Sequence, residues 1–247
     1  QNPCVCVAEV VTRPPISLWR MSAPIEPLSG GHRNQAWRTR GLPQDVVCKS
    51  TTRSEQALAW LIPVQDVARR CGFVVPQMVR STNGRFSEAG WTCEVFVEGE
   101  AVPRDGLADV AALLTNFHAQ TQGWDQRPDF LSSSALLSHD YGGDVDLTQM
   151  PPDVGALCRA AWQTLPDTPT CVVHGDLAPG NVLRLADGRF ALLDWDECRV
   201  DLPLFDTAPH APKSEAEIRA HLAWEVACSW TREPTYAREM AAQLRNT

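Results

Sequence analysis

Short apolar runs separated by turn residues fill the first part of the chain. The runs at 45–50 (DVVCKS) and 91–97 (WTCEVFV) have the length and residue types of strands. The pair Asn83-Gly84 lies between two such runs, which is a strong signal for a hairpin turn. We therefore expect residues 16–98 to form a small, mainly β lobe.

One helical stretch interrupts these strands, from Ser54 to Arg70. Ser54 suits an N-cap, because its hydroxyl can accept a hydrogen bond from an unpaired N–H of the first turn. Gly72 suits the end of the helix. Pro63 lacks an N–H, so we expect it to split the helix or to begin a second one.

Helical patterns dominate after a linker at 98–100. Apolar residues recur with a period near 3.6 from Leu107 onward. One β segment, residues 171–194, interrupts this part of the chain. We expect residues 99–247 to form a larger, mainly helical lobe, with further helices near 153–163, 214–230 and 235–246.

The composition is that of a folded, acidic protein. Apolar residues make up 44% of the chain, and 22 basic against 30 acidic residues give a net charge of -8. A nucleic-acid-binding protein usually carries a basic surface, so we expect no nucleic-acid partner. No apolar stretch approaches the ~20 residues of a membrane helix, so we expect no membrane partner. Residues 1–15 lack the pattern of a signal peptide and are expected to be a tail of uncertain role.

Nine cysteines are present, most of them inside apolar runs, and no CxxC pair occurs. This pattern is typical of buried free thiols. It predicts a reducing, cytoplasmic location, because disulfides are rare there.

The stretch at 171–196, CVVHGDLAPGNVLRLADGRFALLDWD, carries the candidate chemistry. If Asp187 and Gly188 form a two-residue hairpin loop, the register pairs Asn181 with Asp194 on one face, with Cβ atoms ~5 Å apart. Two hard oxygen ligands at that separation can share a Mg²⁺ ion. An ordinary hairpin with polar ends is the alternative, but it does not explain the HGD that precedes it.

Asp176 lies five residues before Asn181, on the loop that leads to the same face. An aspartate near a metal pair need not itself bind the metal. It can orient a hydroxyl group and accept its proton late in phosphoryl transfer. Asp176 is therefore our candidate catalytic residue.

The motifs HGDLAPGN and LLDWDE resemble those of the aminoglycoside phosphotransferase and choline kinase superfamily, which has a protein-kinase-like fold. The resemblance implies an α+β, bilobal fold with Mg²⁺-ATP between the lobes, GTP being an open alternative. It also implies that Asp176 is the catalytic base and that Asn181 and Asp194 bind Mg²⁺.

The same resemblance assigns roles to residues of the N-terminal lobe. Lys49 ends a strand and is the expected partner of the nucleotide phosphates, held by Glu55. A solvated strand end and a plain surface glutamate are the alternatives. The remaining expected nucleotide-binding residues are a glycine loop over the phosphates (Ser29, Gly30, Gly31, Asn34) and a hinge at the adenine (Glu94, Phe96, Val97).

Several features depart from protein kinases. HGD replaces HRD, and DWD replaces DFG. Only a short segment separates Asp194 from Asp206, which leaves little platform for a peptide, so we expect a small-molecule acceptor and no protein substrate. His174 is expected to brace the catalytic loop, and Asp206 to serve as a structural cap or anchor.

Acidic residues after Asp194 favour a cationic acceptor, such as an aminoglycoside or another amine. Solvated or capping roles for these residues are the alternative, and a neutral sugar or amino alcohol stays open as the acceptor. A catalytically silent nucleotide-binding module is the rival function. The residues expected to line the acceptor pocket are Trp195, Asp196, Glu197, Asp201, Trp224 and Glu225.

Overall fold

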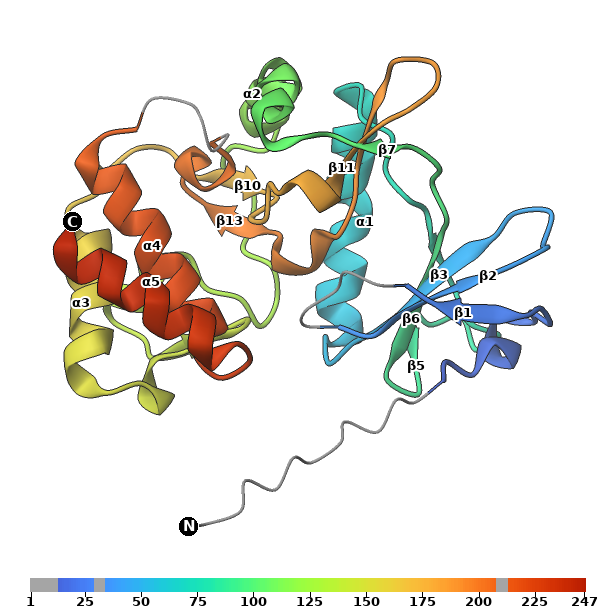
Figure 1. Cartoon of the computed structure of the whole chain (residues 1–247), viewed down its shortest axis with the longest axis horizontal. Coiled ribbons are helices and arrows are strands. Elements are labelled where there is room, and N and C mark those ends of the chain that lie inside the picture. The colour runs from blue at the N-terminus through green and yellow to red at the C-terminus, as the bar shows by residue number, and fades with distance from the viewer. Residues whose placement is uncertain (1–12, 29–33, 208–212) are drawn as a thin grey trace, which may run out of the picture. The chain divides into compact units, whose positions relative to one another are not determined.

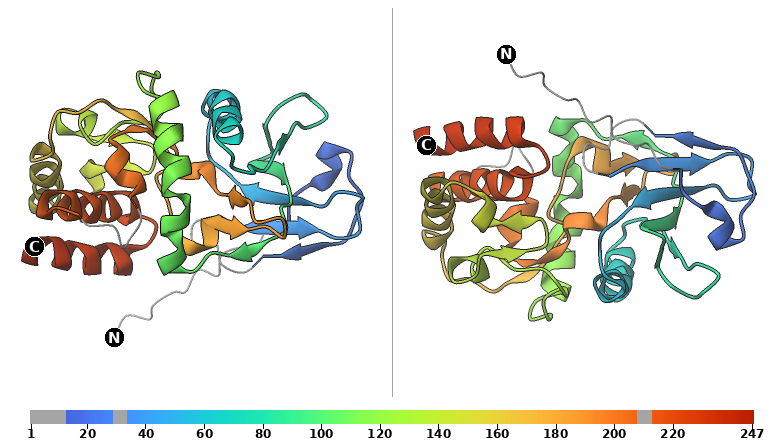
Figure 2. Two further views of the ribbon diagram at one scale, coloured as in Figure 1. Left: turned by 90° about the horizontal axis from the view of Figure 1, so that it is seen from above. Right: turned by 90° about the horizontal axis from the view of Figure 1, so that it is seen from below.

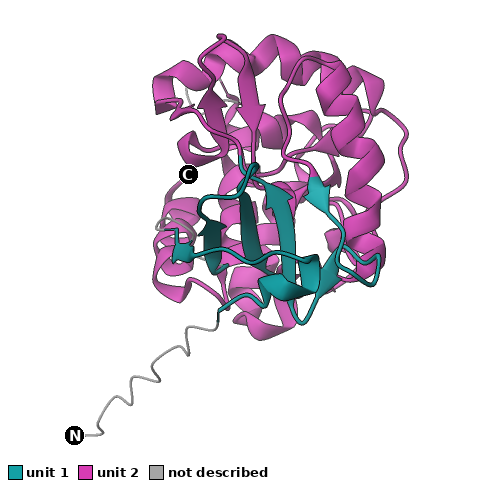
Figure 3. Cartoon of the chain, turned by 90° about the vertical axis from the view of Figure 1, so that its right-hand side faces the viewer, with its two compact units in different colours: residues 1–52, 78–96 teal, residues 53–77, 97–247 magenta. Residues whose placement is uncertain are grey.

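The computed structural model of the chain describes residues 13–28, 34–207 and 213–247. They form the mixed α and β structure expected from the sequence (Figure 1). The chain divides into two compact units (Figure 3). Unit 1 comprises residues 1–52 and 78–96, and unit 2 comprises residues 53–77 and 97–247.

Unit 1 is built on an antiparallel sheet with the order β1-β2-β3-β6-β4, and β5 also pairs with β6. Its strands are β1 (Ile25–Pro27), β2 (Ala36–Thr39), β3 (Val46–Ser50), β4 (Met78–Val79), β5 (Ser87–Glu88) and β6 (Trp91–Val95). Alternate side chains of the central strands point to one face, as the pleat requires. That face forms the core of unit 1, with the buried residues Trp19, Trp37, Val46, Cys48, Trp91 and Cys93.

Helix α1 (Glu55–Arg70) begins at the expected N-cap, where Ser54 Oγ accepts from the N–H of Ala57 at 3.2 Å. The expectation that Pro63 breaks this helix is wrong, because α1 is continuous through it. Pro63 and Ala59 are both exposed. Water can therefore bond the Ala59 carbonyl, which loses its helical partner at a proline four residues on.

Helix α1 groups with unit 2, whereas the sequence placed it within the N-terminal lobe. Arg127 of unit 2 donates to the Ala57 carbonyl at 3.1 Å, and Trp60 Nε1 donates to the Asp125 carbonyl at 3.1 Å. The chain passes from unit 1 to unit 2 again between Phe96 and Val97, close to the expected linker.

Unit 2 contains three small antiparallel sheets and the remaining helices. Its strands are β7 (Glu100–Ala101), β8 (Tyr141–Gly142), β9 (Val145–Asp146), β10 (Cys171–Val173), β11 (Val182–Arg184), β12 (Phe190–Leu192) and β13 (Arg199–Asp201). β10 pairs with β13, β11 lies between β12 and β7, and β8 pairs with β9. Its further helices are α2 (Ala111–Gln120), α3 (Pro152–Gln163), α4 (Glu215–Ser229) and α5 (Pro234–Asn246).

Helices α3, α4 and α5 pack side by side in both views of Figure 2. Buried apolar residues, among them Val154, Trp162, Trp224 and Leu244, fill the space between these helices and the pair β10–β13. Ser214 and Glu217 form a reciprocal capping box that begins α4.

Seven cysteines lie within the described part of the chain, and all seven are buried free thiols, as the sequence predicted. None of the helices in the described ranges is long and apolar enough to cross a membrane.

Candidate active site

The hairpin β11–β12 has a different register from the one expected. Val182 faces Leu192 and Arg184 faces Phe190, so residues 186–188 form a three-residue loop. Gly188 takes a left-handed conformation (φ +83°) there, and the Asp187 carboxylate accepts from the N–H of Arg189 at 3.1 Å. A left-handed residue at the end of a three-residue loop is a common hairpin geometry.

The predicted direct pairing of Asn181 with Asp194 is therefore wrong. The backbone of Asn181 bonds that of Leu193, whose N–H donates to the Asn181 carbonyl at 2.8 Å. Asp194 is the next residue along the chain. Asn181 and Asp194 are still at the same end of the hairpin, but Asn181 pairs with the residue before Asp194.

Asp176 and Asn181 are in direct contact. Asn181 Nδ2 donates to Asp176 Oδ2 at 2.7 Å and to the Asp176 carbonyl at 3.0 Å. Because both partners are acceptors, the orientation of the amide follows, and Oδ1 is directed away from Asp176. The loop 177–180, with a 3-10 turn at Pro179–Asn181, closes on itself through these two bonds.

His174 braces this loop from the core. The side chain is buried, and its Nε2 donates to the Leu193 carbonyl at 2.7 Å. Its backbone N–H and that of Gly175 both donate to Asp206, each at 2.8 Å. Trp195 lies edge-on to the imidazole, with the ring centroids 5.0 Å apart.

Asp206 also accepts from His118 Nε2 at 2.8 Å, so its carboxylate gathers three N–H donors. Burial opposes ionisation of this carboxyl group, but the hydrogen bond from His118, the nearby imidazoles and the Gly175 N–H together hold its pKa below the ordinary value. The sequence indicated only a structural aspartate here and did not foresee the bond to His118.

A Mg²⁺ ion fits the donor set at the end of the hairpin. Asn181 Oδ1 and the Asp194 carboxylate are hard oxygen ligands of the kind that Mg²⁺ prefers. Among the described residues, no group of three or more His, Cys, Asp or Glu could hold a metal by itself. An ion held by Asn181 and Asp194 would therefore complete its shell with water and nucleotide phosphates, as Mg²⁺ usually does.

Two arginines that the sequence analysis missed hold the segment after Asp194. Arg127 Nη1 donates to the carbonyls of Trp195, Asp196 and Cys198, at 3.3, 2.8 and 3.0 Å. Arg53 donates to both carboxylate oxygens of Asp196, at 2.9 and 2.7 Å. Neither arginine lies in a recognisable motif, so no local signal indicated these contacts.

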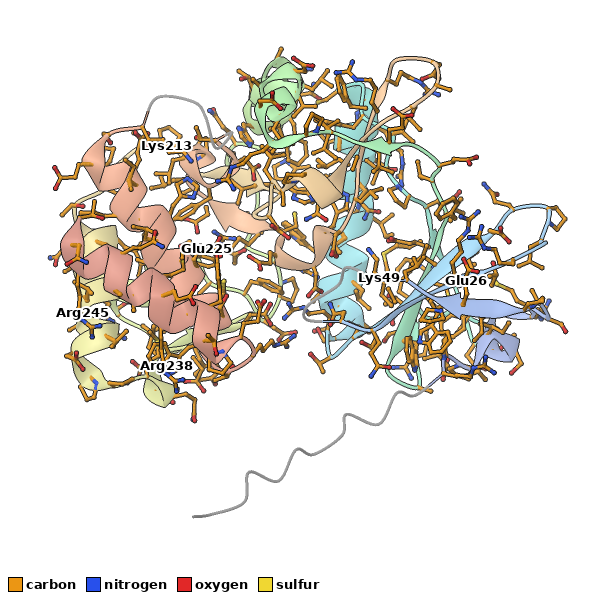
Figure 4. All side chains as sticks on the ribbon, viewed as in Figure 1. Glu26, Lys49, Lys213, Glu225, Arg238 and Arg245 are labelled. Atoms are coloured by element: carbon orange, nitrogen blue, oxygen red, sulfur yellow. The ribbon has the colours of Figure 1, made fainter. Side chains whose placement is uncertain are left out.

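In unit 1, Lys49, which is labelled in Figure 4, forms an ion pair with Glu94, with Nζ 2.8 Å from Oε1. The two residues come from the neighbouring strands β3 and β6, where Lys49 faces Thr92 and Glu94 faces Val47. Glu94 was expected at the hinge, but its side chain contacts the lysine. The expected role of Glu55, in unit 2, as the holder of Lys49 stays a prediction.

The other nucleotide-binding predictions also stay predictions. Ser29, Gly30 and Gly31 lie outside the described residues, which resume at Asn34. Phe96 donates its N–H to the Asp45 carbonyl at 2.9 Å and places its ring under the Arg38 guanidinium.

Three of the expected acceptor-pocket residues are buried in the core of unit 2. Asp201 is fully buried, and its carboxylate binds Arg199 Nε at 2.9 Å and the Ser133 hydroxyl at 2.7 Å. Trp195 donates Nε1 to the Leu192 carbonyl, and Trp224 lies under the Arg199 guanidinium. The expectation that these three line an open pocket is wrong, because tertiary contacts occupy their polar groups and ring faces.

The other three are half-buried. Asp196 is neutralised by Arg53, which also binds Asp144 at 2.6 Å. Glu197 accepts from Trp224 Nε1 at 3.4 Å. Glu225, labelled on α4 in Figure 4, accepts from the Tyr236 hydroxyl at 3.0 Å. The nearby Glu225 charge adds to burial in raising the pKa of Tyr236.

A cavity of about 560 Å³ has Asp206 in its lining. It is lined by residues of α2 and of the start of α4, with His118 and Asp206 among the polar ones. Asp176, Asn181 and Asp194 do not line it. This cavity is therefore separate from the candidate catalytic residues.

Several solved structures have a fold similar to that of this chain. Choline kinase LicA from Streptococcus pneumoniae is similar in structure, with a TM-score of 0.63 at 13% identity over 94% of this chain and 95% of that one. A thermostable mutant of aminoglycoside phosphotransferase APH(4)-Ia has a TM-score of 0.62 at 14% identity over 94% and 96%. A microcompartment-associated aminopropanol kinase has a TM-score of 0.58 at 15% identity over 94% and 91%. At these identities the likeness shows a shared fold.

The family assignment comes from the sequence itself. No match was found among curated protein sequences. The model of the family described as "Phosphotransferase enzyme family" matches residues 24–242, which is most of the chain. The chain therefore belongs to this phosphotransferase family.

Proposed function

We propose that the protein transfers the γ-phosphate of ATP to a hydroxyl group of a small, positively charged acceptor. The observation that carries the proposal is the contact between Asp176 and Asn181. In this contact the Asn181 amide donates to Asp176, whose carboxylate can receive a hydroxyl proton, and the amide oxygen of Asn181 is directed away from Asp176.

Asp176 Oδ2 accepts from Asn181, so the carboxylate is held in one orientation with its other oxygen, Oδ1, remaining to face an acceptor hydroxyl. In this position Asp176 would align the hydroxyl and take its proton late in the transfer. His174 and Asp206 hold the loop through its backbone, so the carboxylate needs little reorganisation.

Asn181 and Asp194 would hold Mg²⁺, which when bound neutralises charge on the phosphates. Lys49 would add a further positive charge toward the phosphates, with Glu94 as the carboxylate that orients its ammonium. ATP is the proposed nucleotide. One structure of the same fold is a streptomycin-ATP complex of an aminoglycoside phosphotransferase.

The proposal that the acceptor is positively charged depends on fewer acidic residues than the sequence suggested. Asp196 and Asp201 are each paired with an arginine. Glu197 and Glu225 are half-buried, and their carboxylates accept hydrogen bonds from Trp224 Nε1 and from the Tyr236 hydroxyl. We propose that the negative charge of these two glutamates favours a cationic acceptor.

The test is a screen for ADP formation from ATP with hydroxylated amines, aminoglycosides, neutral sugars and anionic alcohols. We expect turnover with a cationic alcohol, and loss of turnover in Asp176→Asn. Asp187→Asn, at the exposed tip of the same hairpin, is the matched control and should keep full activity. Phosphorylation of neutral alcohols alone would reject the cationic acceptor, and absence of both turnover and Mg²⁺-nucleotide binding would reject the function.

A further inference from the structure

Asp194 has an unusual backbone conformation. Its φ of 58° and ψ of 69° are left-handed, and it is one of the few non-glycine residues with positive φ among the described residues. Aspartate tolerates this region better than most residues, but at a cost. Such a conformation persists only where the surroundings hold it, and it often marks a functional position.

The chain is held firmly on the N-terminal side of Asp194. Leu193 donates its N–H to the Asn181 carbonyl at 2.8 Å, and its own carbonyl accepts from His174 Nε2 at 2.7 Å. Both backbone groups of Leu193 are therefore bonded to residues of the catalytic loop.

Arg127 holds the chain on the C-terminal side. Its side chain is 1% exposed, and Nη1 bonds three carbonyls of the segment 195–198. Nε bonds the Ala57 carbonyl of α1, which anchors the guanidinium from behind. The preceding residue, Gln126, bonds both the N–H and the carbonyl of Val200, at 2.9 and 2.8 Å.

Nε and Nη1 of Arg127 donate to backbone carbonyls, whereas a buried arginine is more often paired with a carboxylate. Burial lowers the pKa of this guanidinium to about 10, which shows that its environment disfavours the charge. A buried cation is costly unless its hydrogen bonds are made. Leucine or methionine could fill the same space at lower cost, so simple packing does not explain an arginine here.

Arg53 holds the side chain of the same segment. It binds both oxygens of Asp196 and one oxygen of Asp144. Arg53 and Arg127 also contact the same aromatic ring, since the Phe130 ring centroid lies 4.9 Å from the guanidinium carbon of Arg53 and 4.2 Å from that of Arg127. A bidentate arginine–carboxylate pair fixes orientation as well as distance.

We propose that Arg127 is a positioning residue for Asp194. It fixes the carbonyls that follow Asp194, so that the strained aspartate presents its carboxylate to the Mg²⁺ of the nucleotide. Arg53 supports the same segment through Asp196. The inference rests on the proposed function, because it requires Asp194 to be a metal ligand. It assigns Arg127 and Arg53 no contact with the nucleotide.

The test is Mg²⁺-dependent binding of a fluorescent ATP analogue, measured at equilibrium without an acceptor. In Arg127→Lys and Arg127→Met we expect the half-saturating Mg²⁺ concentration to rise roughly tenfold, the effect typical of residues that orient a metal ligand. Nucleotide affinity in EDTA should stay as in the wild type. Arg53→Gln should raise the half-saturating concentration by less, because the bonds of Arg53 to this segment reach the Asp196 side chain and Arg127 holds its backbone carbonyls.

Arg159→Met is the matched control. Arg159 also bonds carbonyls, those of Leu136 and His139, and pairs with Asp140, so its bonds reach residues 136–140 instead of 195–198. It should lower the melting temperature without changing the Mg²⁺ dependence. An equal shift in Arg159→Met, or wild-type Mg²⁺ dependence in the Arg127 variants, would overturn the inference.

Two further outcomes separate the inference from the function. If the Arg127 variants do not fold, Arg53→Gln decides the matter, and an unchanged Mg²⁺ dependence in that variant overturns the proposal. If the wild type binds the nucleotide with no Mg²⁺ dependence, the proposed function fails and the inference with it.

Discussion

At the scale of single residues, the candidate site depends on carboxylates with distinct partners. Asp176 is bonded by the amide of Asn181, Asp206 collects the N–H groups of the catalytic loop, and Asp196 is paired with Arg53. Aspartates close together in the sequence therefore have different roles, because each meets a different set of donors.

Asp176→Asn and Asp194→Asn should differ in nucleotide binding. Asp176→Asn should lower kcat by about 10²–10⁴-fold while Mg²⁺-nucleotide affinity survives, because the residue acts on the acceptor. Asp194→Asn should also weaken Mg²⁺-nucleotide binding, since a charged metal ligand is lost. Titration of each variant with a fluorescent ATP analogue and Mg²⁺ measures the difference, and equal affinities in the two variants would contradict the assignment.

Asp206→Asn should lower stability at neutral pH by about 1–3 kcal/mol, because a buried charged acceptor of three hydrogen bonds is replaced. The lowered pKa of Asp206 means that its contribution is present above the ordinary carboxyl pKa of 3.8 and is lost as the pH falls through the lower folded value. The variant should therefore lose less stability than the wild type below about pH 4. Urea unfolding at pH 7, 5 and 3 measures this, with exposed Asp167→Asn as the control.

At the scale of elements, two glycines with similar φ angles have different surroundings. Gly175 (φ +86°) lies in the HGD loop, where an added Cβ would come 2.7 Å from Arg199 Nη1 and 2.8 Å from the Glu197 carbonyl. Gly188 (φ +83°) lies in the hairpin loop, where nothing is within 4 Å of an added Cβ. The catalytic loop is thus packed closely against the segment after Asp194, and the hairpin tip is open.

Gly188→Ala should cost only the left-handed strain of about 1 kcal/mol and keep activity. Gly175→Ala carries the same strain and also a clash with a backbone carbonyl, so it should cost more stability and most of the activity. Thermal unfolding and ADP formation measure both. Similar losses in the two variants would show that the close approach at Gly175 is not needed.

At the scale of the whole molecule, the two compact units do not follow the simple order of the chain. Unit 2 includes α1 because its bonds run to residues of that unit, such as Arg127 and Asp125. The strands before and after α1 belong to unit 1.

Hydrogen exchange under mildly denaturing conditions tests this grouping. We expect the amides of α1 to open together with those of α2 and β10, and not with those of β3 and β6, because cooperative opening follows packing. Opening of α1 together with β3 and β6 would contradict the grouping.

The sequence alone determined much of this protein. Helical periodicity and the cap at Ser54 predicted helices, and the spacing of Asp176, Asn181 and Asp194 indicated candidate catalytic and metal-binding residues. These predictions depend on neighbours a few residues apart, where backbone geometry directly limits which side chains can meet. The hairpin was predicted for the same reason, but its register was not, since a loop of two or three residues fits the same letters.

Only the tertiary structure decided the rest. The pairs of Lys49 with Glu94, of Arg53 with Asp196 and of Arg127 with the segment 195–198 join residues 45, 143 and about 70 positions apart. Charged residues at such separations carry no local signal of their partners, because many pairings are possible in the unfolded chain. Packing selects one of them, and this selection moved Trp195, Asp201 and Trp224 from an expected pocket into the core.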